Sequence, residues 1–374
     1  MSDLQDGDTS AFERQADRQA EGDGGKDQTP SGERRLNFNR AAEAGSGSMR
    51  RAEIANSAEA QEPGHGRSAE SPAEIPPRGW KDILWRVYAG ISDDRVLANA
   101  AAVTFYGLLA LFPAIGALVS IYGLFADPGT IAKQLDTMNG ILPGGAIDVI
   151  RDQMTRVASQ GGGKLGLSFL LGLAVSLWSA NGGIKALFDA LNVVYEEKEE
   201  RSFIRLNAVS LTFTVAMIFF LIIAITCVVA VPVVLAFFPG FVATLVNYAR
   251  WPAMLVLVAL VFACVYRFGP NRATPRWRWI SWGSVFAAFA WLAASALFSW
   301  YASSFGSFNK TYGSLGAVIG FMTWMWLSVI VILIGGKLNA ETEHQTARTS
   351  TEGPDKPIGA RGAQMADTVG ASRG

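Results

Sequence analysis

The sequence has few of the residues that catalysis and metal binding most often use. Among 374 residues there are only two histidines and two cysteines. His65 and His344 lie near opposite ends of the chain, whereas Cys227 and Cys264 lie inside apolar runs. The sequence has no HExxH motif, CxxC motif or zinc-ligand set, and two cysteines make no disulfide framework. We therefore predict that the protein is not an enzyme, with no catalytic residues, no metal and no cofactor.

Charged residues are also scarce, and they are concentrated at the two ends. They make up 17% of the chain, against about a quarter in soluble proteins. The net charge is zero, so no basic field points to nucleic acid as a partner. Residues 1–79 hold fifteen acidic and ten basic side chains but only two aromatic ones, Phe12 and Phe38. Such polar segments bury too little apolar surface to fold, which predicts a disordered leader over 1–78 and a disordered tail over 344–374.

Long uncharged runs fill the region between these ends. About 20 apolar residues of helix cross a bilayer, and a spanning segment must satisfy its own backbone hydrogen bonds. The run from Leu206 to Ala249 is too long for one crossing, and Pro232 and the Pro239-Gly240 pair predict a turn near its middle. The fold class is therefore all-α: a polytopic membrane helical bundle with about six transmembrane helices in a domain over 79–343. The predicted spans are 98–125, 165–184, 207–237, 250–268, 280–304 and 313–336.

Three further segments are predicted to be amphipathic helices at the membrane interface or helical extensions. Around Trp80, apolar residues recur at helical spacing through Val87. The same spacing recurs over 147–157, in the connection after the first span. After the second span, apolar residues continue on one face through 185–200, so that helix either runs on or bends at Gly182-Gly183.

The distribution of basic residues predicts the orientation. Fifteen Lys and Arg flank the spans on one side and six on the other. The richer side is normally cytoplasmic, which places both termini in the cytoplasm and agrees with an even number of spans. The first apolar run begins near Val96, too late for a cleavable signal peptide, so it would itself direct insertion.

Polar residues at membrane depth are candidates for function because burying them in lipid is costly. Asn99 and Tyr106 lie in the first span, and Asn181 lies beside two glycines at the end of the second, just before Lys185. These four residues are predicted to line a polar cavity. The alternatives are an interhelical hydrogen bond for Asn181 and an interfacial pair with Asp189 for Lys185.

Two other segments have more than one interpretation. Gly313, Gly316 and Gly320 open the last span, and small residues at this spacing favour close helix packing; a glycine-lined substrate path is the alternative. The connection over 267–279 is basic and aromatic. Its residues Arg267, Arg272 and Arg276 are predicted to contact anionic lipid headgroups on the cytoplasmic face; specific partner binding and RNA binding are the alternatives.

Several of these motifs together resemble the YihY/virulence factor BrkB family of membrane proteins. The resemblance rests on Ala100-Ala-Ala-Val-Thr-Phe-Tyr-Gly-Leu-Leu-Ala-Leu-Phe-Pro, on Leu177-Trp-Ser-Ala-Asn-Gly-Gly and on Tyr266-Arg-Phe-Gly-Pro-Asn-Arg. Tyr312-Gly-Ser-Leu-Gly-Ala-Val and Leu338-Asn-Ala-Glu extend it, so it covers about 80–343 in the right order. It implies a bacterial inner-membrane protein of six helices. Some family members are linked to serum resistance, and the family was once labelled as a transfer-RNA-processing ribonuclease.

Three hypotheses about function follow. The main one is a non-catalytic membrane protein that handles or transports a lipid, an amphiphile or a small solute. The second is a membrane scaffold with no substrate path, which associates with copies of itself or with other membrane proteins. The third is the ribonuclease, which we consider least supported because RNA hydrolysis usually needs acid, base or metal groups in an aqueous cleft.

Overall fold

The computed structural model describes residues 58–123, 167–235, 240–304 and 314–373. All of them belong to the unit Arg51–Gly374. Most of the predicted leader, the amphipathic segment over 147–157 and the predicted turn between the third and fourth spans lie outside the described residues. Within those residues the secondary structure is helical, apart from one isolated bridge between Pro275 and Thr351.

Six long helices lie where the sequence predicts membrane spans, so the predicted all-α fold is confirmed. Their bounds differ from the predicted ones mainly because four of them continue past the apolar run into polar sequence. The second helix passes through Gly182 and Gly183 without a break, which settles the alternative between extension and bend. The helices are α4 (Val96–Gly123), α7 (Leu167–Val194), α8 (Phe203–Leu235), α9 (Gly240–Phe268), α10 (Trp277–Ser304) and α12 (Ser314–His344).

Four of these helices are long and apolar enough to cross a bilayer over residues whose side chains are described. They contain the stretches Leu170–Val194, Phe203–Ile223, Trp277–Tyr301 and Val318–His344. The other two, α4 and α9, have shorter apolar stretches, Val96–Leu111 and Pro252–Phe268. The outward side chains of α8 and α9 include Phe219, Leu245 and Val256, which are all exposed. An apolar exterior of this kind suits lipid rather than water as the surrounding solvent.

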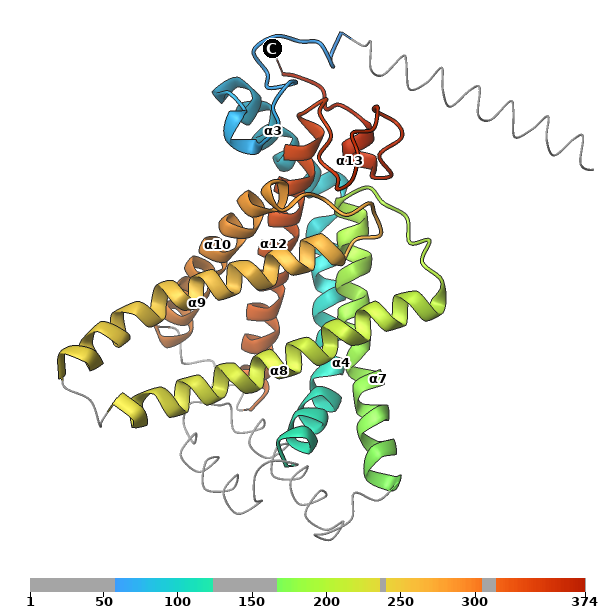
Figure 1. Cartoon of the computed structure of the whole chain (residues 1–374). Coiled ribbons are helices and arrows are strands. Elements are labelled where there is room, and N and C mark those ends of the chain that lie inside the picture. Colours follow the sequence, from blue (N-terminus) through green and yellow to red (C-terminus); the bar gives the residue numbers. More distant parts are fainter. Residues whose placement is uncertain (1–57, 124–166, 236–239, 305–313, 374) are drawn as a thin grey trace, which may run out of the picture. The chain divides into compact units, whose positions relative to one another are not determined.

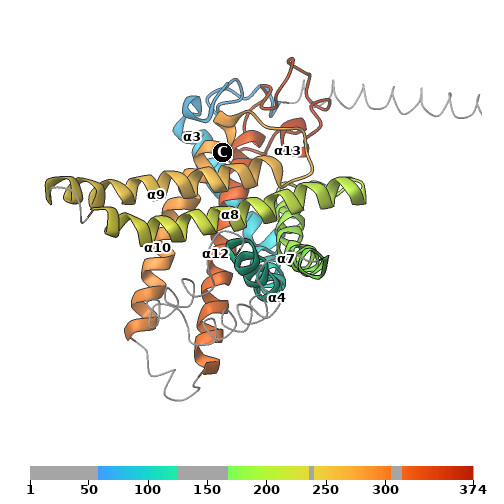
Figure 2. The ribbon, with the colours of Figure 1, turned by 60° about the horizontal axis from the view of Figure 1, so that its bottom comes forward.

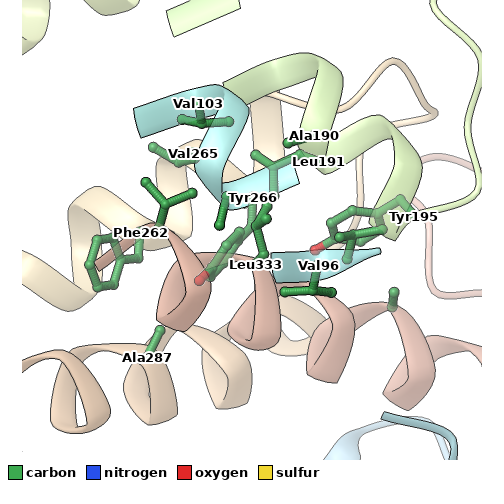
Figure 3. Close-up of a cluster of buried hydrophobic side chains, with 14 of the residues drawn as sticks. Val96, Val103, Ala190, Leu191, Tyr195, Phe262, Val265, Tyr266, Ala287 and Leu333 are labelled. Carbon is green, nitrogen blue, oxygen red and sulfur yellow. The ribbon is translucent and has the colours of Figure 1, made fainter. Parts of the chain in front are cut away.

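The helices pack in a connected series. α4 lies along α7 and α10 lies along α12, and these are the two most extensive contacts; α12 also contacts α4 (Figure 1). α8 packs on α7, and α9 packs on α10, which both views show (Figure 2). The main apolar cluster is shared by α4, α7, α9, α10 and α12, with Leu191, Tyr266 and Leu333 among its fully buried members (Figure 3).

Close helix packing in the part of the chain that the structure describes involves a glycine other than the predicted ones. A Cβ atom at Gly335 in α12 would lie 2.5 Å from the Tyr266 hydroxyl and 2.7 Å from the Ala287 Cβ. A Cβ at Gly320 would meet nothing within 4 Å. Among the described residues Gly320 thus shows no close contact, Gly313 lies outside them, and the surroundings of Gly316 are not described, so the packing role of these three glycines stays a prediction. The close contact of α12 lies nearer its C-terminal end, where it meets α9 and α10.

The predicted interfacial helix is present as α3 (Pro77–Asp93). Ile83 and Val87 are buried against the rest of the unit, as the apolar spacing suggests. Leu84 and Tyr88, in contrast, are 57% and 67% exposed. The helix therefore has one face packed on protein and another apolar face directed outward. Before it, residues 58–76 include the short helix η1 (Pro72–Glu74) and the buried residues Arg67 and Ile75, so the packed chain begins within the predicted leader.

The predicted disordered tail is folded instead. Residues 345–373 pack on the ends of the helices and include the short helix α13 (Gln364–Asp367), with Met365 almost fully buried. The Arg361 guanidinium holds this segment together, because it donates to the carbonyls of Ala347, Arg348, Lys356 and Ala366. The composition argument fails here because backbone carbonyls and contacts with other segments supply the stabilisation that apolar residues do not.

Candidate functional site

The four residues predicted to line a polar cavity each contact different neighbours. Asn181 is fully buried between α7 and α8, where its Oδ1 accepts a hydrogen bond from Thr214 Oγ1 at 3.1 Å. This is the interhelical hydrogen bond that the sequence offered as the alternative. Its Nδ2 is buried without a hydrogen-bond partner among the described residues. Asn181 therefore contributes to the packing of α7 against α8 through Oδ1, while its Nδ2 donor makes no hydrogen bond with the described residues.

The other three predicted cavity residues have separate surroundings. Asn99 Nδ2 donates to the carbonyl of Asp94 at 2.7 Å, just before α4 begins. Tyr106 is half-exposed and makes an edge contact with Phe105. The Lys185 ammonium lies 5.1 Å from the Trp178 ring centroid, a distance typical of a cation–π contact. Among the described residues, none of these contacts joins one predicted cavity residue to another, and the polar cavity stays a prediction.

The arginines of the α9–α10 connection mostly face protein rather than lipid. Arg267 donates to the carbonyl of Pro275, and its Nη2 lies 2.5 Å from Glu352 Oε1. Arg272 is fully buried, with Nη2 2.5 Å from Glu343 Oε2. The predicted headgroup contacts are therefore wrong for these two residues, because their charges are neutralised inside the protein. Arg276 is 30% exposed and pairs with Asp355 at 3.2 Å.

A buried ion-pair network surrounds the C-terminal part of α12. Lys337 Nζ lies 2.9 Å from Asp94 Oδ2 and 3.3 Å from Glu341 Oε1. Arg86 of α3 adds a 2.6 Å contact from Nε to Glu341 Oε2 and donates from Nη2 to Gln345 Oε1 at 2.6 Å. This network joins α3 and the short connection that follows it to α12, and charges that are buried in this way need partners.

The sequence analysis did not predict this network, although the charged residues that form part of it are evident in the sequence. Lys337 and Glu341 are charges that directly follow the last apolar run, inside the same helix. Taken alone, they look like the polar end of a membrane span. Their partners come from segments up to 255 residues away, which no spacing rule connects.

The connection between α7 and α8 is fixed by a second polar cluster. Glu199 accepts hydrogen bonds from the Arg201 side chain at 2.6 and 2.8 Å and from Asn192 Nδ2 at 3.0 Å. Arg201 also donates to the carbonyl of Gly269, at the end of α9, at 2.9 Å. Burial opposes ionisation of Glu199, but the hydrogen bonds from Arg201 and Asn192 hold its pKa below the usual value.

The pKa of Asp94 is shifted in the opposite direction from that of Glu199. Its burial raises the pKa of the carboxyl, and the nearby ammonium of Lys337 only partly offsets that effect. Burial disfavours the charged form of a carboxyl group. Asp94 is therefore the member of the ion-pair network whose charge is least favoured by its surroundings.

A shallow groove of about 680 Å³ lies on the outward face of α3. Its lining combines apolar and aromatic side chains with two exposed cations, Lys81 and Arg373. The Arg373 guanidinium stacks on the Trp85 ring, 3.2 Å from its centroid, and the Arg373 backbone N–H donates to Asp82 Oδ1 at 3.0 Å. The lining residues are Pro77, Trp80, Lys81, Leu84, Trp85 and Arg373.

The groove is continued by further aromatic residues. The rings of Trp80 and Trp282 lie 5.4 Å apart, and Trp282 belongs to the first turns of α10. Tyr88 and Trp277 are also exposed nearby in sequence to Trp85 and Trp282, respectively. Tryptophan and tyrosine are enriched at the membrane–water interface, and the exposure of these side chains suits such a position.

The described residues offer no constellation for metal chemistry. Over 58–123, 167–235, 240–304 and 314–373, no group of three or more His, Cys, Asp and Glu side chains could hold a metal ion. Both histidines pair with carboxylates: His65 Nδ1 lies 2.5 Å from Asp82 Oδ2, and His344 Nδ1 lies 3.3 Å from Glu341 Oε2. These contacts tie the segment before α3 to α3 itself and brace the end of α12, which is a structural role.

Comparisons with known proteins agree with the membrane architecture. The chain is 30% identical over 263 residues to the putative ribonuclease-like protein YfkH of Bacillus subtilis, covering 69% of this chain and 93% of that protein. It is 25% identical over 287 residues to a UPF0761 membrane protein of Neisseria meningitidis serogroup B, covering 73% of this chain and 66% of the relative. No solved structure matches the chain.

The family comparison covers most of the folded unit. The sequence model described as virulence factor BrkB matches residues 87–359. The matched region contains all six long helices, the ion-pair network around Glu341 except Arg86, and the start of the C-terminal segment. The chain is therefore a membrane protein that belongs to the virulence factor BrkB family.

Proposed function

We propose that this membrane protein binds an anionic lipid or a related amphiphile, without catalysis, in the groove on α3. The observation that carries the proposal is the groove lining, which places Lys81 and Arg373 beside Trp80, Leu84 and Trp85. An amphiphile needs apolar contacts for its chain and a cation for its headgroup. An aromatic and basic surface of this kind is suited to anionic lipid at the interface.

The position of the groove supports the cytoplasmic face as its location. The groove lies on α3, which is joined to α12 through Arg86 and Glu341. The α7–α8 connection contacts the end of α9 through Arg201 and Gly269, and the α9–α10 connection contacts α12 through Arg272 and Glu343. These are the segments whose lysines and arginines outnumber those on the other side. The positive-inside rule then favours the cytoplasm for this end of the bundle and for both termini.

The test is native mass spectrometry of the full chain in nanodiscs that contain a mixture of anionic and zwitterionic lipids. We expect the protein to retain anionic lipid preferentially. Each cation near a membrane surface contributes about 1 kcal/mol, so K81A and R373A should each lower anionic-lipid retention about fivefold. K356A removes an exposed cation that does not line the groove and serves as the matched control. Equal retention by all three variants would overturn the proposed site.

A membrane scaffold is the second candidate, and one observation favours it. In the part of the chain that the structure describes, the polar residues Asn99, Asn181 and Lys185 each contact a different neighbour, as packing residues of a scaffold would. The same nanodisc experiment separates the two functions. A stable homo-oligomer or partner complex with no preference for anionic lipid would support the scaffold instead of the lipid-binding protein.

The ribonuclease activity suggested by the name of the Bacillus relative has its own test. The proposal of a non-catalytic protein predicts that the purified chain leaves transfer RNA intact with and without divalent metal. Cleavage that a single substitution in this chain abolishes would establish catalysis and overturn that part of the proposal.

A further inference from the structure

A third buried polar cluster lies beside the ion-pair network. Its side chains belong neither to that network nor to the lining of the groove. Its members are Tyr195 at the end of α7, Arg272 in the α9–α10 connection, and Asn339 and Glu343 in α12. All four side chains are almost completely removed from solvent. The Tyr195 ring lies in the main apolar cluster, near Val96 and Leu333 (Figure 3).

Each of Arg272, Asn339 and Glu343 makes hydrogen bonds through only part of its polar group. Arg272 Nη2 pairs with Glu343 Oε2 at 2.5 Å, and the same oxygen accepts from Ser350 Oγ at 2.9 Å. Asn339 Oδ1 accepts from the Gly283 backbone N–H at 2.8 Å. Four atoms have no hydrogen bond of good geometry among the described residues: Arg272 Nη1, Glu343 Oε1, Asn339 Nδ2 and the Tyr195 hydroxyl. The Asn339 side chain nevertheless lies close enough to the Tyr195 hydroxyl to interact with it.

These four atoms belong to neighbouring side chains. The Arg272 guanidinium carbon is 5.1 Å from the Tyr195 ring centroid, and Arg272 and Glu343 are in direct contact. A buried polar atom without a partner costs about 1–3 kcal/mol, and such atoms are rare in folded proteins. Four of them around one ion pair indicate a shared partner rather than four separate defects.

We propose that the four side chains form an internal site for one or two water molecules. Arg272 Nη1 and Asn339 Nδ2 donate, Glu343 Oε1 accepts, and the Tyr195 hydroxyl can do either. The charges of Arg272 and Glu343 cancel, and the carboxylate of Glu197 also acts on Arg272, which disfavours an anion. Water is the small neutral molecule that both donates and accepts, and buried water typically makes about three such bonds.

The proposed water molecules connect helices of the bundle through hydrogen bonds. Water bound there would link the end of α7 and the α9–α10 connection to α12, at positions that direct side-chain contacts leave incomplete. Unlike the α3 groove, the site is enclosed and takes no lipid, so it does not depend on the proposed function.

The test is hydroxyl-radical labelling by X-ray radiolysis of water in the full chain in nanodiscs, read by mass spectrometry. Radicals formed from bound water modify adjacent side chains even when these are buried. Tyr266 is the matched control, because it is also fully buried in the same cluster and its hydroxyl donates to the Ile332 carbonyl at 2.8 Å. We expect Tyr195 to be labelled at least about threefold faster than Tyr266. Equal protection or equal labelling of the two tyrosines would overturn the site.

A substitution provides an independent measurement. Y195F removes only the hydroxyl and keeps the ring contact with Arg272. If the hydroxyl binds water, its loss should lower the folding equilibrium constant about threefold to tenfold. If it has no partner, its removal should leave the constant unchanged or raise it, which would contradict the proposal.

Discussion

Glu341 shows at the residue scale why the end of α12 is well ordered. Its carboxylate lies within 3.3 Å of Lys337, within 2.6 Å of Arg86 and within 3.3 Å of His344. Lys337 and Glu341 are buried, and Arg86 is largely so. A buried ion pair adds little net stability by itself, but removing one partner leaves the other charge uncompensated.

We therefore expect E341Q to destabilise the protein by about 3 kcal/mol, the lower end of the cost of breaking a buried pair, because Lys337 keeps Asp94 as a partner. The measurement is unfolding in mixed detergent micelles. D355N is the control, because Asp355 is 84% exposed and its partner Arg276 is 30% exposed, so the loss should be less than about 1 kcal/mol. Similar losses in both variants would contradict the importance of the network.

The pKa of Glu199 predicts a local pH dependence. Because the hydrogen bonds from Arg201 hold this pKa below the ordinary value of 4.5 despite burial, the folded state gives up its proton more readily than the unfolded state. The resulting stabilisation is present above about pH 4.5 and is lost as the pH falls through that value toward the folded-state pKa. E199Q should flatten the fall in melting temperature below about pH 4.5, whereas a curve parallel to that of the wild type would refute the prediction.

At the scale of elements, the contact of α12 with α9 and α10 requires a residue without a side chain at position 335. G335A places a Cβ against the Tyr266 hydroxyl and Ala287, and overpacking of this kind costs about 1–3 kcal/mol. G320A, in the same helix, meets no atom of the described residues within 4 Å and should be neutral or stabilising by up to about 1 kcal/mol. Thermal melts of both variants in detergent are the measurement. A larger loss for G320A would support the packing role predicted from the sequence.

The C-terminal segment over 345–373 is the element that the composition misassigns. Its fold depends on Arg361, whose guanidinium is bonded to four backbone carbonyls. R361A should therefore release the segment, and limited proteolysis with proteinase K should cleave it at least about tenfold faster than in the wild type. R348A, which truncates an exposed side chain in the same segment, is the control. Equally fast cleavage in the wild type would mean that the segment is disordered after all.

At the scale of the whole molecule, the prediction concerns sidedness. The segments richest in lysine and arginine gather at one end of the bundle, through contacts such as those of Arg201 with Gly269 and Arg272 with Glu343. A reporter that is active only in the periplasm should be silent when fused after Glu200, in the connection between α7 and α8, and active when fused after Gly163. The opposite pattern would invert the orientation.

The sequence alone determined the helices of the bundle, because a segment that spans lipid must satisfy its own backbone hydrogen bonds and must reach across a bilayer of fixed thickness. Both requirements are local, so apolar runs such as that of α8 could be read directly. The charge bias likewise identified the segments that meet at one end, since it depends on residues near each span.

Only the tertiary structure decided what the polar residues do. The sequence analysis singled out Asn181, Arg267 and Arg272 as notable polar residues. Their partners Thr214, Glu352 and Glu343 come from other elements, so the sequence could not identify them. The groove joins α3 to Arg373, nearly 300 residues later. The order of residues 345–373 was equally hidden, because it depends on carbonyl groups that every residue has and whose position only the fold determines. A single sequence indicates how strongly each residue prefers lipid or water. It does not identify the group with which a buried charge forms an ion pair.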